Sequence, residues 1–192
     1  MKKGPGSLQA KGTKLCSLFL KKIEQKELAR SIQMPQKNSP KKLNPEYLRE
    51  VYPRVNTCPY FQLLSMKLKG LEWGTSHLEA PVEQKHMQPY GMVHGGVCAS
   101  LIDAACFWAA WTTVEGNAGL TTVELKVNYL APISEGTLMA EGKSIKTGRT
   151  LCLSEATVRN QKGTIIAHGT STLMVLESLK IDGEPGELKK YL

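Results

Sequence analysis

The stretch that decides the fold of this chain reads Gly95-Gly-Val-Cys-Ala-Ser-Leu-Ile-Asp103-Ala-Ala-Cys-Phe-Trp-Ala-Ala-Trp-Thr-Thr-Val114. Asp103 is the one ionised residue in it, and small side chains alternate with large apolar ones. A helix that is apolar on nearly every side must be buried on nearly every side. The stretch therefore predicts one long helix, from Gly95 to about Val114, in the middle of the molecule.

Strand patterns lie on both sides of this helix. Two strands are expected before it, at 62–72 and 75–82, with Gly74 in the turn between them. Four strands are expected after it, at 120–131, 137–145, 150–158 and 164–176. The connections 134–136, 147–149 and 160–163 have the composition of hairpin turns. One helix that is apolar all round, among about six mostly antiparallel strands, predicts an α+β fold whose curved sheet wraps around the helix.

The organised part of the chain is expected to start with a short helix. Asn44-Pro45-Glu46 combines an N-cap, a proline at the first helical position and an acid in the first turn. The pattern predicts a helix from Pro45 to about Val51, ended by Pro53.

The positive charge of the chain is concentrated at one end. Residues 1–43 carry eleven Lys and Arg against two Glu, a net charge of +9, whereas the remaining residues carry a net charge of −1. We therefore predict three parts: a basic N-terminal extension at 1–43, a folded domain at 44–176 and a charged C-terminal tail at 177–192.

Three interpretations of the N-terminal extension remain open. It could be a solvated, partly disordered arm, or a helix over about 14–33 that docks on the body or on a partner. It could also bind a membrane surface or nucleic acid, but a single Arg and few aromatic residues argue against that, and we expect no nucleic-acid partner.

The sequence also predicts the compartment. No apolar run is long enough for a transmembrane segment, and Leu15–Leu20 is too short for the core of a signal peptide. Five cysteines, an odd number without a Cys-x-x-Cys pair, fit free thiols better than disulfides or a zinc site. We expect a cytoplasmic protein.

Two features of the predicted helix carry possible chemistry. The first N–H groups of a helix lack internal partners, and the glycines of His94-Gly95-Gly96 would let a ligand approach them closely. Such a helix start can bind an anion or an oxyanion, although a Gly-Gly pair alone is more often a turn. Asp103 lies eight residues further on, and an aspartate in a charge-free helix needs either bonding partners or a function.

Taken together, these residues resemble a known family. The motif Gln88-Pro-Tyr-Gly-Met-Val-His94-Gly95-Gly96, followed after six residues by Asp103, is similar to the signature of hotdog-fold thioesterases of the phenylacetate-degradation type. Residues 119–132 resemble the next strand of that family, and Gly148-Arg149 resembles its hairpin. The similarity spans about residues 45–176. It implies a hotdog fold and hydrolysis of a thioester, usually to coenzyme A, without a cofactor or metal.

The resemblance also implies roles for individual residues. The backbone N–H of Gly95 would polarise the thioester carbonyl, and Gln88 would assist or orient it. Asp103 would act as general base on water or as nucleophile. Thr122 lies about where some members have a hydroxyl that helps to hold the water, with Thr121 as a neighbouring candidate and plain β-propensity as an equally good explanation.

Other residues have weaker assignments. Lys146 and Arg149 could meet the phosphates of coenzyme A, or could be a solvated hairpin tip. His94 is expected to shape the turn rather than to take part in catalysis. Four large side chains could line an acyl pocket, although core packing is the default for residues of this kind: Met92, Phe107, Trp108 and Trp111.

Gly95 and Asp103 are too far apart along one helix to serve one carbonyl. Eight residues correspond to ~12 Å of helix axis. A second chain running antiparallel would bring each Gly95 close to the other chain's Asp103, which predicts a homodimer or a dimer of dimers.

The preferred function is therefore an acyl-CoA thioesterase. The alternatives are a non-catalytic acyl-CoA-binding or scaffold protein and, with less support, a hotdog dehydratase or hydratase. The latter enzymes pair a catalytic His with an Asp or Glu in motifs that this sequence lacks.

Overall fold

The computed structural model describes residues 40–116, 118–179 and 188–192. Most of the predicted N-terminal extension, including its possible helix over 14–33, lies outside the described residues. The division of the chain into three parts therefore stays a prediction.

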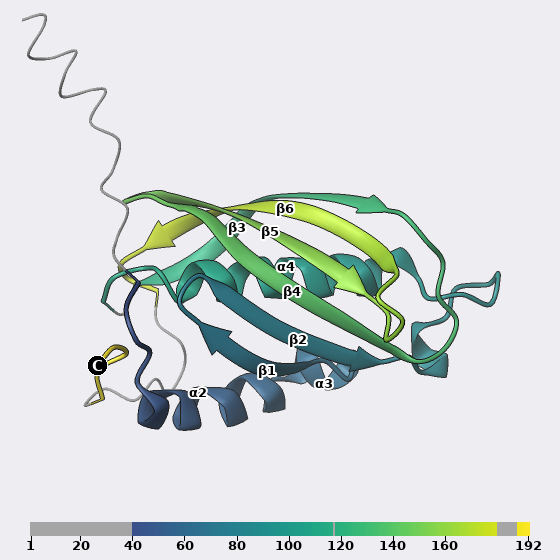
Figure 1. Cartoon of the computed structure of the whole chain (residues 1–192), viewed down its shortest axis with the longest axis horizontal. Helices are drawn as coiled ribbons and strands as arrows, with labels where there is room; N and C mark the ends of the chain where they lie inside the picture. The colour runs from purple at the N-terminus through teal and green to yellow at the C-terminus, as the bar shows by residue number, and fades with distance from the viewer. Residues whose placement is uncertain (1–39, 117, 180–187) are drawn as a thin grey trace, which may run out of the picture. The chain divides into compact units, whose positions relative to one another are not determined.

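The central helix, α4 (Gly95–Trp111), lies in the curve of one six-stranded sheet, as Figure 1 shows. The strands are β1 (Lys67–Glu72), β2 (Thr75–Pro81), β3 (Gly119–Tyr129), β4 (Thr137–Thr147), β5 (Leu151–Arg159) and β6 (Ile165–Leu176). Their order is β1-β2-β4-β5-β6-β3, and all neighbours are antiparallel. The predicted α+β fold with a curved sheet around one helix is confirmed.

Close contact between the helix and the sheet depends on small residues. A Cβ atom at Gly142 of β4 would lie 2.2 Å from the backbone oxygen of Ala105 in α4, so only glycine fits there. The same oxygen accepts a hydrogen bond from Ser76 Oγ of β2 at 2.7 Å. Small residues of the two strands, Gly142 and Ser76, thus let β4 and β2 lie directly against the backbone of α4.

The two helices before the sheet differ from the sequence prediction. Helix α2 runs from Pro45 to Thr57 and continues through Pro53, where it was expected to end. Pro53 faces solvent, where water can bond the backbone oxygen that its missing N–H leaves free. On the other face Tyr47, Val51 and Val55 are buried at a spacing of four residues, and this packing continues the helix.

The first predicted strand is also shorter than expected. A short helix, α3 (Pro59–Leu63), occupies the residues before it, and β1 begins only at Lys67. A 3-10 turn, η1 (Gln84–His86), lies in the loop between β2 and α4.

One of the three predicted hairpin turns does not join a hairpin. Gly136 has a positive φ of 94°, as a turn residue should, but the strands on either side of it do not pair with each other. Strand β3 lies at the edge of the sheet beside β6, whereas β4 lies between β2 and β5. Residues 130–136 therefore cross from the edge of the sheet to its middle, while the other two turns do connect paired strands.

The helix α4 is not covered on every side by its own chain. Most of its residues are buried, but one strip is only half-buried: Ala99, Ser100, Asp103, Ala104 and Phe107. The beginning of the helix was predicted correctly, and its end comes at Trp111 rather than near Val114. A single chain thus leaves one face of the apolar helix open.

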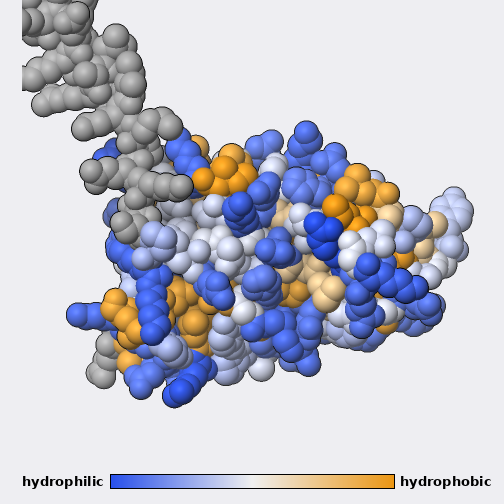
Figure 2. Space-filling view, viewed as in Figure 1, coloured by the Kyte–Doolittle hydropathy of each residue, from blue (hydrophilic) through white to orange (hydrophobic). Residues whose placement is uncertain are grey.

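The outward surface is mixed in character. Figure 2 shows a mostly hydrophilic face with separate hydrophobic patches. Several apolar side chains of the sheet are exposed, among them Ile145, Leu151 and Leu153. No helix within the described ranges is long and apolar enough to cross a bilayer.

The last residues of the chain are packed, although a peripheral tail was expected at 177–192. Tyr191 pairs with Leu43 in an isolated β-bridge, and the Asn44 N–H donates to the Lys190 carbonyl at 2.9 Å. The Tyr191 hydroxyl donates to the backbone oxygens of Thr112 and Val114 at 3.1 and 2.7 Å. Residues 188–192 therefore belong to the packed body.

Lys190 caps the C-terminal end of α4. Its side chain is buried, with the residue 4% exposed, and Nζ donates to the backbone oxygens of Trp111 and Val114. Nζ also lies 3.9 Å from the centre of the Trp111 ring. A cation is favoured at this end of a helix because the unpaired carbonyls carry partial negative charge.

Replacing this lysine should weaken the fold. We expect Lys190→Met to lower the free energy of unfolding by about 2 kcal/mol, because two hydrogen bonds from a charged group are lost and the Trp111 carbonyl loses the Lys190 donor. Lys189→Met is the matched control, since Lys189 is exposed. Urea denaturation compares the two variants, and equal stability of both would contradict the capping role.

Candidate active site

The start of α4 presents an unoccupied hydrogen-bond donor. His94 is the N-cap, and its Nδ1 accepts the N–H of Gly96 at 2.9 Å, so the structure supports the turn-shaping role predicted for this residue. The Val97 N–H donates to the His94 carbonyl at 3.0 Å. Across residues 40–116, 118–179 and 188–192, the Gly95 N–H has no hydrogen-bond partner. It is the free donor of this helix start.

The loop before α4 holds Gln88 near that donor. The Gln88 N–H donates to the Met92 carbonyl at 2.9 Å, Met87 and Val93 form a β-bridge, and the His94 N–H donates to the His86 carbonyl at 2.8 Å. These three contacts form a short antiparallel ladder. The ladder places Gln88 and the start of α4 at opposite ends of one small, connected unit.

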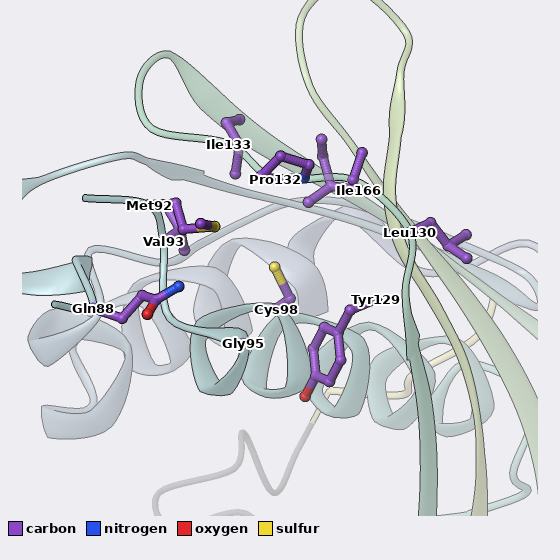
Figure 3. A pocket seen from close by; sticks show the side chains of 11 residues that line it. Gln88, Met92, Val93, Gly95, Cys98, Tyr129, Leu130, Pro132, Ile133 and Ile166 are labelled. Carbon is purple, nitrogen blue, oxygen red and sulfur yellow. The ribbon is translucent and has the colours of Figure 1, made fainter. Parts of the chain in front are cut away.

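A cavity of about 490 Å³ lies between this unit and the sheet. Gln88 and Gly95 line it together with mostly apolar residues: Met92, Val93, Cys98, Tyr129, Leu130, Ala131, Pro132, Ile133 and Ile166. Figure 3 shows the Gln88 amide directed toward the cavity and the Cys98 sulfur pointing away from α4 into it. Burial raises the pKa of the Cys98 thiol to about 11, so this sulfur is a neutral wall atom at neutral pH.

Tyr129 explains why residue 95 is glycine. A Cβ at Gly95 would lie 3.0 Å from two carbons of the Tyr129 ring. The ring therefore rests on the backbone at the start of α4, and a larger residue would push it away. Gly95 was expected to be glycine so that a ligand could approach the backbone, and the absence of a side chain also makes room for the Tyr129 ring.

Asp103 meets Thr122 on the half-buried strip of α4. Thr122 Oγ1 donates to Asp103 Oδ1 at 2.8 Å. Thr122 pairs with the buried Leu173 and so faces the helix, whereas Thr121 pairs with the exposed Met174 on the other face. Of the two threonines proposed from the sequence, the structure brings Thr122 to Asp103.

The predicted site residues form two separate groups within one chain. Gln88 and Gly95 share the cavity, but neither Asp103 nor Thr122 lines it. Lys146 and Arg149 are exposed at the β4–β5 hairpin. That hairpin contacts the other end of α4, where Thr113 Oγ1 bonds Thr147 Oγ1, so the structure does not bring these two cations to the cavity of their own chain.

The large apolar residues proposed for an acyl pocket lie in three different places. Met92 lines the cavity. Trp108 and Trp111 are buried in the core, and Trp111 stacks on Tyr47 with ring centres 6.0 Å apart. Phe107 lies on the half-buried strip of α4. The sequence prediction did not identify Tyr129 and residues 130–133 as part of the cavity wall. The available signal was the end of a strand, marked by the change from polar to apolar residues at Asn128-Tyr129-Leu130 and by the proline at position 132.

Within the described part of the chain, no three His, Cys, Asp or Glu side chains cluster as metal ligands would. Cys58, Cys98, Cys106 and Cys152 are free thiols there, and Cys16 lies outside the described residues.

The six-stranded sheet around a central helix, with a donor-bearing loop at the helix start, defines a hotdog-fold protein. The chain is similar in structure to a solved thioesterase family protein from Silicibacter pomeroyi, with a TM-score of 0.62 and 32% identity over 69% of this chain and 98% of that one. Residues 90–167 match the Thioesterase superfamily.

Curated relatives agree with this match. The chain is 31% identical to the proofreading thioesterase EntH of Klebsiella pneumoniae, over 48% of this chain and 68% of that protein. It is 29% identical to acyl-coenzyme A thioesterase 13 of Mus musculus, over 65% of this chain and 91% of that protein. The chain belongs to the thioesterase superfamily.

Proposed function

We propose that this protein hydrolyses acyl-CoA thioesters to a free acid and coenzyme A. The observation that carries the proposal is the unpartnered N–H of Gly95 in the wall of an apolar cavity. A thioester carbonyl gains negative charge when it is attacked, and a preorganised helix N-terminus stabilises that charge. The mostly apolar wall suits the acyl chain of such a substrate.

The proposed reaction uses the residues in the following way. The Gly95 N–H binds the carbonyl oxygen, and the Gln88 amide donates to the same oxygen or holds the thioester in place. Asp103 takes a proton from water as the water oxygen attacks the carbonyl carbon, and Thr122 orients Asp103 and the water. The carbon–sulfur bond then breaks, and the coenzyme A thiolate takes up the proton. In the alternative route, the Asp103 carboxylate attacks the carbonyl carbon, the carbon–sulfur bond breaks and coenzyme A leaves as the thiolate. Water then hydrolyses the mixed anhydride, which gives the free acid, restores the Asp103 carboxylate and supplies the proton that the thiolate takes up.

A second copy of the chain completes this site in the proposal. Asp103 is ~12 Å along the helix from Gly95 and does not line the cavity of its own chain. The half-buried strip of α4 that carries Asp103 needs a cover, and a partner's antiparallel α4 would supply it. Next to the strip, edge strand β3 exposes Val123 at 51% and Tyr129 at 58%. In this homodimer, Lys146 and Arg149 would come from the partner and could bind the coenzyme A phosphates.

Two further predictions accompany the proposal. Pairing of these dimers into a dimer of dimers and a cytoplasmic location remain predictions. The choice of acyl-CoA is also part of the proposal: the murine relative is named an acyl-coenzyme A thioesterase, and this supports coenzyme A as the carrier.

A panel of acyl-CoA substrates of different chain length, with detection of the released thiol, tests the function. We expect turnover of at least one member of the panel. If members of the panel bind to the protein but none of them releases thiol, the result would instead favour the non-catalytic alternative.

Asp103→Asn tests the proposed base. An asparagine side chain has nearly the same shape as an aspartate side chain, and its oxygen can still accept the hydrogen bond from Thr122. The fold should therefore be unchanged. Turnover should fall by ~10²–10⁴-fold, the usual contribution of general-base catalysis. The measurement is kcat on the best substrate of the panel, with circular dichroism as the control for folding. Near-wild-type turnover would exclude Asp103 from the chemistry.

The neighbouring threonines provide a matched pair. Thr122→Val removes the hydroxyl that bonds Asp103, whereas Thr121→Val removes a hydroxyl from the opposite face of the same strand. We expect Thr122→Val to lower kcat about tenfold, the equivalent of one hydrogen bond to a charged group, and Thr121→Val to leave kcat unchanged. Equal effects of the two substitutions would remove Thr122 from the site.

Hybrid dimers test the shared site. Gln88→Ala and Asp103→Ala chains carry different affinity tags, are co-expressed, and the hybrid is purified over both tags. If each site takes Gln88 from one chain and Asp103 from the other, the hybrid has one site with both changes and one with neither. We expect about half of the wild-type activity per dimer, because a two-fold dimer has two equal sites.

The parent homodimers of each variant should be inactive in the same assay. A purified hybrid as inactive as its parents would show that each chain contains a complete site, and would rule out the shared arrangement.

A further inference from the structure

His86 is a buried histidine that the proposed reaction does not use. It ends η1, and the residue is 1% exposed. Its Nδ1 accepts the N–H of Glu83 at 3.1 Å. Because a nitrogen that accepts a hydrogen bond carries no proton, the neutral ring holds its proton on Nε2. In the described ranges, Nε2 is one of two buried side-chain atoms without a hydrogen-bond partner.

His86 also forms one end of the antiparallel ladder that positions Gln88 and the start of α4. The His86 carbonyl accepts the N–H of His94, the residue directly before Gly95. Two residues beyond His86, the N–H of Gln88 donates to the Met92 carbonyl. The position of Gln88 relative to Gly95 therefore depends on where His86 is held.

The charged groups around His86 are Glu83 and Lys85. Lys85 Nζ lies 3.3 Å from Glu83 Oε2 and donates to Ser65 Oγ at 2.7 Å. Burial lowers the pKa of His86, and Lys85 lowers it further, while the charge of Glu83 and the Leu64 carbonyl oppose the fall. Protonation of His86 would put a proton on Nδ1, which could then no longer accept the hydrogen bond from the Glu83 N–H. It would also place a positive charge in a buried position.

We propose that neutral His86 is a positioning residue and that its protonation releases the loop before α4. The Nδ1 of the neutral ring fixes η1 and the ladder, and this holds Gln88 and the Gly95 N–H so that both can reach one carbonyl. The role of the two convergent groups rests on the proposed function, whereas the anchoring of the loop does not. Since the folded state disfavours the protonated form, the anchoring is complete above the ordinary histidine pKa of about 6.5. It weakens as the pH falls below that value and is lost as the pH falls through the lowered pKa of His86.

Two substitutions separate the acceptor from the charge. In His86→Asn the amide oxygen can take the place of Nδ1 and accept the Glu83 N–H, but it does not titrate. In His86→Leu the acceptor is absent. His77→Asn is the control, because His77 is an exposed histidine on β2.

The first readout is hydrogen exchange of the backbone amides in residues 86–94, measured by mass spectrometry at pH 8 and at pH 5. At pH 8 we expect faster exchange in His86→Leu than in wild type, and wild-type exchange in His86→Asn and His77→Asn. At pH 5 wild type should exchange faster than His86→Asn. Equal exchange of wild type and His86→Asn at both pH values would overturn the protonation step, even if His86→Leu does not fold.

The second readout is kcat for the best acyl-CoA substrate as a function of pH. His86→Leu should lower kcat at pH 8 about tenfold, since the Glu83 N–H is left unpaired. His86→Asn should keep kcat at pH 8 and retain more of it than wild type at pH 5. Loss of kcat in His86→Asn equal to that in His86→Leu would overturn the positioning role. If wild type hydrolyses no acyl-CoA, the proposed function fails, and the exchange measurement still decides whether His86 anchors the loop.

Discussion

The fold depends on the enclosure of an almost uncharged helix. Water cannot solvate the apolar sides of α4, so the sheet must curve around it, and the curve is possible because small residues let the strands approach the helix backbone. Gly142 of β4 lies against Ala105 of α4 at one such approach. The ends of α4 cannot be enclosed in the same way, because their backbone groups need polar partners.

The two ends of α4 are treated differently. At the C-terminal end, Lys190 and Tyr191 bond the last carbonyls, and this end is sealed by the chain itself. At the N-terminal end, His94 bonds Gly96 and leaves the N–H of Gly95 open to the cavity. One end therefore contributes stability, and the other contributes the donor on which the proposed chemistry rests. Asp103 lies between them on the strip of the helix that the sheet leaves open.

Local patterns in the sequence predicted much of this arrangement. The charge-free run predicted α4, and alternation predicted the strands after it. The motif from Gln88 to Asp103 predicted two residues that line the cavity, Gln88 and Gly95, and the aspartate on the open strip. Features that depend on contacts between distant parts of the chain were not predictable. Pro53 could not reveal that Tyr47, Val51 and Val55 would hold α2 together, and the turn at Gly136 could not reveal that β3 pairs with β6. The burial of Lys190 and His86 likewise depends on neighbours that only the fold brings near.

The central claim is that one thioester carbonyl is bound by Gly95 of one subunit and faced by residue 103 of the other. A crystal structure of the Asp103→Asn variant with an unhydrolysed acyl-CoA substrate tests it most directly. The account predicts a carbonyl oxygen about 3 Å from the Gly95 nitrogen, with the side chain of residue 103 from the partner subunit on the open side of the carbonyl carbon. A carbonyl that meets Gly95 and residue 103 of the same chain, or an acyl group outside the cavity, would contradict it.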